Sequence, residues 1–364
     1  MTNLTQLVPT LPPDINGLGD FALALTRQLQ QAHGLQTELV VANPTWAGTA
    51  AALGQPVRQL AQRRAAALVA ILPRDRPLLL HYEGYGYARR GWPHWLLQAL
   101  RTWRQQSRQP LLTLFHEVYP YHAKPPWTSS FWLSPLQRRL AASLLRLSDR
   151  ALTSKQSYAA LLRTLGGPEA PPITALPVFS NVGEPSRNQP YEQRPRRLIV
   201  FGHPRGRRLT YERDRPALEA VGQALQIEEI SDIGLPTGLT LSSIGHCPLR
   251  EWGVLPAAQV SAQMQGAIAG FLSYVTPAYL AKSTIFAAYA AHGLAPLLGA
   301  QAGQPSDGLQ PGRHYWLAGA GAATLTPAKA AALAQAAQAW YQTHSLAVYA
   351  RTVVDCLGMI PTRI

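Results

Sequence analysis

Cysteine is scarce in this sequence: among 364 residues only Cys247 and Cys356 occur, far apart and without a partner at CxxC spacing. This argues against a disulfide framework and against a zinc site built from cysteines. Long apolar runs are also missing, because no stretch of about 18 apolar residues occurs, so we expect no membrane-spanning helix. The first residues have neither the charged start nor the apolar core of a signal peptide. We therefore predict a cytoplasmic protein.

Acidic residues and lysine are also scarce. The chain has 19 Asp and Glu against 33 Lys and Arg, a net charge of +14, and almost all of its cations are arginine. Arginine grips phosphate and carboxylate with two parallel hydrogen bonds, so this balance fits nucleic acid, an anionic membrane face or phosphorylated substrates. An arginine-rich genomic composition would give the same count. No zinc-finger, homeodomain-like or RNP1 motif occurs, so we do not expect nucleic acid as a partner. No acidic DxD-like cluster occurs either, and we predict no metal.

The chain is too long for one ordinary core, and its 47% hydrophobic residues are enough for two. Residues 180–196 are polar and contain three prolines and one glycine, a composition typical of linkers. We predict an N-terminal domain over 1–180, a linker over 181–196, a second domain over 197–343 and a C-terminal helix over 344–364.

Both halves alternate short apolar strands with segments of helical periodicity. In the first half we predict strands at 4–9, 37–42, 78–82, 111–115, 151–155 and 173–178, and helices at 20–33, 57–72, 94–107, 134–147 and 156–165. In the helix at 134–147, Ser134 is the expected N-cap and Pro135 the first helical residue. Such alternation predicts a parallel sheet with helices on both faces.

The second half repeats this plan. The predicted strands are 197–201, 227–231, 240–244, 268–273 and 294–298, and the predicted helices are 214–225, 256–265, 283–292, 327–341 and 345–357. We therefore expect an α/β protein built from two Rossmann-like domains.

Lys282, Ser283 and Thr284 stand directly before an alanine-rich helical run. A helix N-terminus carries free N–H groups and partial positive charge, so a lysine and two hydroxyls there predict a phosphate or diphosphate site. Alternatively, Ser283 is only an N-cap and Lys282 a solvated residue. The helix could also begin at Thr276 with Pro277 in its first position.

An early glycine loop contains Gly17, Gly19 and Asp20, between the first predicted strand and the first helix. Glycines there let a ligand approach the backbone, so we predict an acceptor or phosphate loop. The alternative is a tight turn with Asp20 as N-cap.

His116 and Glu117 follow the strand at 111–115 immediately. Ligands of open parallel sheets lie outside the carboxyl ends of strands, where His116 could polarise a substrate oxygen and Glu117 could accept from a hydroxyl. Alternatively, backbone carbonyls satisfy the histidine. His81 also ends a strand, and we rank it second.

Residues 201–213 follow the first strand of the second half with a glycine and several cations. These are Gly202, Arg205, Arg207, Arg208 and Arg213. Guanidinium groups at the carboxyl end of a strand suit a diphosphate, although a run of charges is more often a solvated loop.

Residues 125–147 combine tryptophans with arginines and an amphipathic helix. This pattern suits an anionic membrane face, while a helix packed on the first sheet is the alternative.

These features together resemble a glycosyltransferase of the GT-B fold, broadly of the retaining family 4 type, over nearly the whole chain. The resemblance is carried by GLGD (17–20), FHE (115–117), PVFSN (177–181), Gly202 with Arg208-x4-Arg213, KSTIFAAYAAHGLAP (282–296) and WYQTHS (340–345). It implies two domains facing across a cleft, with the C-terminal helix crossing back to the first domain.

The resemblance also implies the function. A nucleotide sugar would bind mostly to the second domain, a carbohydrate or lipid-linked acceptor would bind to the first, and no cofactor would be needed. A hexose would be transferred with retention, in polysaccharide, glycolipid or glycoconjugate synthesis. His116 and Glu117 would be catalytic, and the donor would be held by Gly202, Arg208, Arg213, Lys282, Ser283, Thr284 and Asn181.

One departure from the family pattern concerns its acidic pair. The usual Glu-x7-Glu positions fall on Leu280 and Ala288, and neither is acidic. A catalytically silent sugar-nucleotide-binding or scaffold protein is therefore the alternative function, since a fold does not fix an activity.

Overall fold

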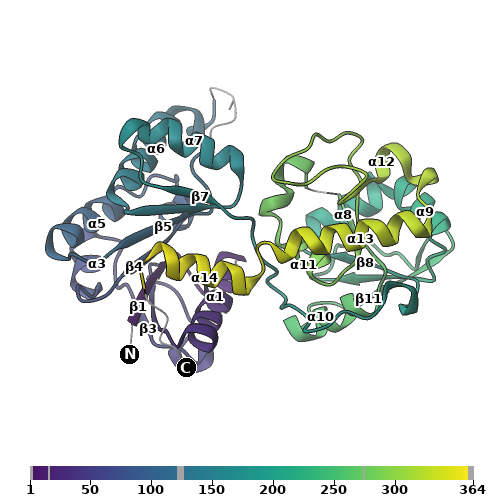
Figure 1. Cartoon of the computed structure of the whole chain (residues 1–364), viewed down its shortest axis with the longest axis horizontal. Coiled ribbons are helices and arrows are strands. Elements are labelled where there is room, and N and C mark those ends of the chain that lie inside the picture. Colours follow the sequence, from purple (N-terminus) through teal and green to yellow (C-terminus); the bar gives the residue numbers. More distant parts are fainter. Residues whose placement is uncertain (1–2, 15–16, 121–126, 274, 360–364) are drawn as a thin grey trace. The chain divides into compact units, whose positions relative to one another are not determined.

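The computed structural model describes residues 3–14, 17–120, 127–273 and 275–359. The chain forms two compact units (Figure 1). The first unit consists of Met1–Leu176 together with Tyr349–Ile364, and the second unit consists of Pro177–Val348.

The first unit contains a sheet of seven parallel strands in the order β3-β2-β1-β4-β5-β6-β7. Their bounds are β1 Asn3–Val8, β2 Gln36–Val41, β3 Val57–Gln59, β4 Leu78–Tyr82, β5 Leu111–Phe115, β6 Arg150–Thr153 and β7 Ile173–Ala175. Every residue of β4 and β5 is buried. Their continuous apolar sequences are typical of parallel strands covered on both faces.

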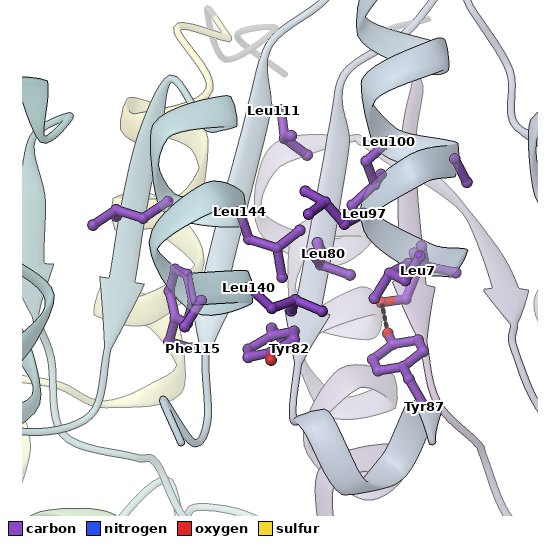
Figure 2. Packing of buried hydrophobic residues seen from close by; sticks show 14 of the residues in the cluster. Leu7, Leu80, Tyr82, Tyr87, Leu97, Leu100, Leu111, Phe115, Leu140 and Leu144 are labelled. Carbon is purple, nitrogen blue, oxygen red and sulfur yellow. Dashed lines mark hydrogen bonds between the residues drawn. The ribbon is translucent and has the colours of Figure 1, made fainter. Parts of the chain in front are cut away.

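Helices cover both faces of this sheet. They are α1 Gly17–His33, α2 Ala50–Leu53, α3 Ala65–Ile71, α4 Gly84–Tyr87, α5 His94–Gln106, α6 Ser129–Leu147, α7 Gln156–Gly166 and α14 Leu346–Cys356. Side chains alternate along a strand, so Leu7 packs into the cluster under α3, α5, α6 and α7, while Val8 packs into the cluster under α1 and α2. Figure 2 shows the first of these clusters, where the Tyr87 hydroxyl donates to the Leu7 carbonyl at 3.1 Å.

Two helix predictions in the first unit are right in part and wrong at their starts. The predicted helix over 57–72 is a strand at Val57–Gln59, paired with β2, followed by the short helix α3. The predicted helix over 134–147 begins at Ser129, because the Thr128 side chain caps it by accepting from the Phe131 amide at 3.3 Å. Pro135 therefore lies inside α6 and Ser134 is not its cap.

The described residues of the second unit form a sheet of seven strands in the order β10-β11-β9-β8-β12-β13-β14, in which the β10–β11 pair is antiparallel and the other pairs are parallel. Their bounds are β8 Arg197–Phe201, β9 Glu229–Ile233, β10 Ser243–Ile244, β11 Cys247–Glu251, β12 Ala269–Leu272, β13 Ala295–Leu298 and β14 Trp316–Leu317. The helices are α8 Pro204–Glu212, α9 Arg215–Ala224, α10 Ala257–Gln265, α11 Thr284–Ala291, α12 Ala318–Gly321 and α13 Pro327–Gln342. The predicted α/β fold with two Rossmann-like domains is confirmed.

Residues 201–213, predicted as a loop, are mostly the helix α8. His203 caps it by accepting from the Arg205 amide at 3.2 Å, and Pro204 occupies its first position. Proline is favourable there because its missing N–H has no partner in the first turn of a helix.

The polar run predicted as a linker is attached to the second unit. The Arg194 guanidinium is buried and donates to the carbonyls of Ala267, His292 and Gly293 at 2.8–3.2 Å, and the Asn188 amide donates to Ala291 at 3.0 Å. The second unit spans Pro177–Val348 and so includes this run, whereas the sequence predicts a linker over 181–196 and a second domain over 197–343.

Candidate functional site

A cavity of about 290 Å³ lies at the carboxyl edge of the second sheet. The first strand of this unit, β8, has β9 on one side and β12 on the other, so the chain changes direction there. Such a switch point is where open α/β sheets bind ligands. The polar residues lining the cavity are His203, Arg205, Arg207, Thr210 and Ser273, and its apolar wall includes Phe271 and Ile285.

Gly202 brings the β8 loop against the first turn of α11. Its φ of +122° is a conformation that L side chains rarely adopt, and a Cβ there would lie 2.4 Å from the Ile285 Cδ1. Glycine at this position therefore keeps the wall of the cavity in place.

The Lys282-Ser283-Thr284 triplet lies at the start of α11, as predicted, but its members differ in role. Ser283 caps α11 by accepting from the Phe286 amide at 3.2 Å. Lys282 ends the 3-10 helix Pro277–Lys282, and Thr284 is the first residue of α11. Both are half-buried, and neither lines the cavity, although Ile285 of the same turn does.

Arg207 is the buried cation of this site. Its guanidinium is 1% exposed, forms an ion pair with Asp232, and donates from Nε to the Gly202 carbonyl at 3.0 Å. It also donates to the Leu235 carbonyl, and the Tyr211 hydroxyl donates to Asp232. Arg207 therefore holds together the loops that follow β8 and β9.

The two arginines predicted to hold the donor phosphates are both in ion pairs and do not line the cavity. Arg208 lies on the exposed side of α8, 2.8 Å from Glu212. Arg213 pairs with Asp214 at 2.8 Å and donates to the Ser273 carbonyl at 2.6 Å, next to the cavity. Among the described residues, Arg205 is the exposed arginine that lines it.

The sequence did not single out two hydroxyls of the cavity wall. Thr210 of α8 donates at 2.8 Å to the Oγ of Ser273, which directly follows β12. Thr210 reaches the cavity because residues 204–212 form the helix α8. A loop over 201–213 gives no periodicity from which the direction of Thr210 could be predicted. Asn181 is half-buried outside the cavity, and its Oδ1 has no hydrogen-bond partner among the described residues.

The first unit brings His116 and the glycine turn together. In this sheet the switch point lies between β1 and β4. His116 follows β5, with its amide 3.0 Å from the Tyr82 carbonyl, and the Phe21 ring contacts its imidazole edge-on at 5.1 Å. Phe21 adjoins Asp20 in the first turn of α1, so the predicted loop and the predicted histidine are neighbours.

The glycine turn is the start of α1. Because α1 begins at Gly17, Asp20 lies inside its first turn and is not the N-cap. Gly19 is closely packed, since a Cβ there would lie 3.0 Å from the Thr10 carbonyl oxygen, whereas no atom of the described residues lies within 4 Å of a Cβ at Gly17. Gly19 therefore serves packing, and Gly17 has no such packing against the described residues.

Glu117 is held by helix α7. Its carboxylate accepts from the Tyr158 hydroxyl at 2.6 Å, and the Lys155 ammonium lies 4.8 Å from the centre of the Tyr158 ring. The side chain is half-buried, which suits a fixed acceptor at the sheet edge.

His81, ranked second from the sequence, is fully buried beside His116. Its Nδ1 lies 3.0 Å from the His116 Nε2, and its Nε2 lies 2.8 Å from the Gln6 Oε1. Burial lowers the pKa of His81 to about 3, so its ring is neutral at ordinary pH. No group of three or more His, Cys, Asp or Glu side chains within the described part of the chain could hold a metal ion.

No protein-family profile and no curated protein matches this sequence. Solved structures match it closely in fold. The Anabaena protein HepE, in complex with UDP-glucose, has a TM-score of 0.62 at 12% identity, covering 98% of this chain and 100% of HepE. A Listeria monocytogenes protein, provisionally assigned as a UDP-N-acetylglucosamine 2-epimerase, gives 0.61 at 12%, covering 97% and 94%.

The lipopolysaccharide outer core galactosyltransferase WaaB, in its apo form, gives a TM-score of 0.52 at 11% identity, covering 98% of this chain and 99% of WaaB. Likeness at such identities concerns the fold. The chain therefore has the GT-B fold, with two parallel-sheet α/β domains and a C-terminal helix that returns to the first of them.

Proposed function

We propose that the protein transfers a hexose from a nucleotide sugar to an acceptor hydroxyl, with retention and without a metal. One observation carries this proposal: the second unit has a cavity at its switch point, bordered by Arg205 and by the N-terminal turn of α11. HepE, of the same fold, is solved with UDP-glucose. A nucleoside diphosphate is the ligand whose charge fits this cavity.

The chemistry follows from the charge of the leaving group. Breaking a bond between a sugar and a diphosphate builds negative charge on the phosphate oxygens. In our proposal Arg205 and the N–H groups of α11 stabilise that charge at the cavity. Lys282 and Arg213, which do not line the cavity, would support them from the start of α11 and from beside Ser273. One preorganised donor of this kind typically contributes about 10²–10³ in rate.

The first unit would supply the acceptor side. We assign His116 to orient a substrate hydroxyl at the carboxyl edge of the first sheet, close to the open turn at Gly17. Glu117 accepts from Tyr158 and would accept in the same direction from a sugar hydroxyl.

The residues at the positions of the missing acidic pair indicate which groups would recognise the sugar. Leu280 is 1% exposed and Ala288 0%, so both side chains belong to the core and face no ligand. The ribose and the sugar would therefore be recognised by other groups, such as the Thr210 and Ser273 hydroxyls of the cavity wall.

A donor screen tests the proposal. UDP-, GDP- and ADP-sugars would be compared by thermal shift and by release of the nucleoside diphosphate, with and without candidate acceptors. A donor at 100 times its Kd should stabilise the protein by about 2.7 kcal/mol. Binding without turnover would favour the silent sugar-nucleotide-binding alternative, and interconversion of the free nucleotide sugars would favour an epimerase.

We further propose that the acceptor is lipid-linked and lies at an anionic membrane face. Support comes from a group of exposed rings, the aromatic surface, formed by Tyr85, Trp92, Trp127, Phe131 and Trp132. Trp127 is 84% and Trp132 70% exposed. Exposed aromatic rings of this kind are typical of proteins that bind interfaces.

The segments that carry the aromatic surface are joined by a hydrogen bond, and their stretch of sequence is basic. The Gln137 amide of α6 donates to the Arg90 carbonyl at 2.8 Å, which ties the start of α6 to the segment after β4. Between residues 84 and 148 the only acidic residue is Glu117, whereas nine are Lys or Arg. Anionic headgroups would attract this surface, each nearby cation adding about 1 kcal/mol. No helix of the described residues has the length and apolarity to cross a bilayer.

Sedimentation with vesicles tests this. The wild type should pellet with vesicles containing an anionic phospholipid and stay in solution with zwitterionic ones. The double variant Trp127→Ser/Trp132→Ser should lose most of that binding. Val254→Ser, which changes a 67% exposed apolar residue of the second unit, is the matched control and should bind normally. Equal binding of the two variants would contradict the membrane proposal.

A further inference from the structure

A chain of hydrogen bonds runs through the buried face of the first sheet to His116. It links Thr26 of α1, Gln6 of β1, His81 of β4 and His116 after β5. Thr26, Gln6 and His81 are each 0% exposed, and three separate elements supply them. Because buried polar groups need partners, the direction of each hydrogen bond in such a chain can be worked out.

The direction is fixed at the α1 end. The Thr26 hydroxyl donates its single proton to the Ala22 carbonyl at 2.8 Å, so it can only accept from Gln6, whose Nε2 lies at 2.9 Å. The Gln6 amide is thereby oriented with its Oε1 toward His81. Because an amide oxygen only accepts, the His81 Nε2, at 2.8 Å, must carry the proton.

The same logic reaches His116. A neutral histidine has one proton, and His81 has placed it on Nε2, so the His81 Nδ1 carries a lone pair. The His116 Nε2, 3.0 Å away, must therefore donate to it. The two rings lie within 17° of parallel, so the donated N–H can lie close to the plane of the accepting ring.

We propose that Thr26, Gln6 and His81 are positioning residues that hold His116 in its Nε2–H tautomer, so that Nδ1 is the ring atom that accepts a hydrogen bond from substrate. The four hydrogen bonds all point from His116 toward Ala22. Their dipoles therefore add along the chain, which favours one arrangement of protons over its reverse. The choice of Nδ1 as the substrate-facing atom rests on the proposed function, whereas the tautomer does not.

Nitrogen-15 NMR of the imidazole rings tests the tautomer directly. Two-bond proton–nitrogen correlations of the full chain distinguish Nε2–H from Nδ1–H rings, and the His116→Gln variant identifies the His116 signals. The wild type should show His116 as Nε2–H. A wild-type His116 that is Nδ1–H, or an even mixture, would overturn the proposal.

Two variants of Gln6 separate direction from packing. Gln6→Leu removes the acceptor for the His81 Nε2 proton, so His81 can hold its proton on Nδ1 and His116 should become a mixture or Nδ1–H. Gln6→Glu keeps an acceptor at this point and should restore the wild-type tautomer. If the His116 signals of Gln6→Leu equal those of the wild type, this chain of hydrogen bonds (the relay) does not determine the tautomer of His116.

Thr26→Val is the second route if Gln6→Leu does not fold. Without the hydroxyl, the Gln6 amide can turn over, and a mixed His116 tautomer is expected. Thr5→Val is the matched control, because Thr5 is a buried threonine on β1, the strand of Gln6, and its hydroxyl has no hydrogen-bond partner among the described residues. An effect of Thr5→Val equal to that of Thr26→Val would assign the change to packing and contradict the proposal.

Glycosyl transfer is measured separately in the same variants. A misplaced orienting group can cost about 10² in rate, so Gln6→Leu should lower kcat by up to that factor and leave the Kd of the nucleotide unchanged. If the wild type shows the Nε2–H tautomer but transfers no sugar, the proposed function fails while the relay stands. If transfer is normal and His116 is Nδ1–H, the relay fails while the function stands.

Discussion

Removing the buried cation of the second unit should unfold it far more readily than removing an exposed one. Arg207→Met deletes a guanidinium that is 1% exposed and leaves Asp232, 4% exposed, without its ion-pair partner. It also leaves the Gly202 and Leu235 carbonyls without their donor. Breaking a buried pair in this way costs about 3–5 kcal/mol, because an uncompensated charge stays in the interior.

The measurement is urea unfolding followed by tryptophan fluorescence. The Trp252 indole N–H donates at 3.2 Å to the Oγ of Ser231, which precedes Asp232 in β9. The emission of Trp252 therefore reports on the surroundings of Asp232. With an m-value of about 2 kcal/mol per molar, the midpoint of the second unit should fall by about 1.5–2.5 M. The chain has two units, so the transitions are fitted separately rather than as one two-state step.

Two further variants separate the charge from the shape. Arg208→Met, one residue along α8, breaks an exposed ion pair with Glu212 and should leave the midpoint unchanged. The double variant Arg207→Met/Asp232→Asn removes the unpaired charge, and the amide oxygen that replaces the carboxylate can still accept from the Tyr211 hydroxyl. We therefore expect it to regain about 1–3 kcal/mol of the free energy of unfolding that Arg207→Met loses. Equal midpoints for Arg207→Met and Arg208→Met would contradict the conclusion that Arg207 holds together the loops that follow β8 and β9.

Four further outcomes are expected. Lys282→Ala should remove most of the thermal shift produced by a nucleoside diphosphate, and an unchanged shift would exclude Lys282 from the donor site. His116→Ala should lower kcat and leave nucleotide affinity nearly intact; weaker binding with normal turnover would contradict its assignment. Gly202→Ala should weaken donor binding, because the new Cβ would displace Ile285 from the cavity wall; calorimetry checks this, and wild-type affinity would show that the wall tolerates a side chain. Burial lowers the pKa of His292 to about 4, so the unfolded chain takes up a proton that the folded one refuses as the pH falls below about 6.5; about 2 kcal/mol of stability should be lost by pH 5, and His292→Gln should remove that part of the pH dependence in urea titrations.

Much of the fold could be predicted from the sequence, because apolar strands of parallel sheets stand out. The strands at 78–82, 111–115 and 197–201 have the predicted bounds. The failures have local causes. The strand at 57–59 has two exposed polar residues at a sheet edge. Helix α6 starts at a threonine cap that lies upstream of the proline predicted to be its first residue.

The candidate site was harder to predict than the fold. Strand ends located His116 and the turn at Gly17 correctly relative to the first sheet, since that follows from topology alone. The cations of the second unit depend on the phase of α8, which turns Arg207 inward and Arg208 outward. Reading that stretch as a loop removed the periodicity that distinguishes them. The partners of His81 are distant in sequence, and no local pattern reveals them.

The return of α14 to the first unit affects when that unit can be completed during synthesis. Tyr349 of α14 packs edge-on against Phe21 at 5.2 Å, and Phe21 in turn contacts His116. The helix that covers this face is made after the whole second unit, because the second unit, Pro177–Val348, precedes most of it in the sequence. A nascent chain halted before residue 346 would therefore lack the Tyr349 ring that packs against Phe21, and we expect it to depend on chaperones until α14 has been made.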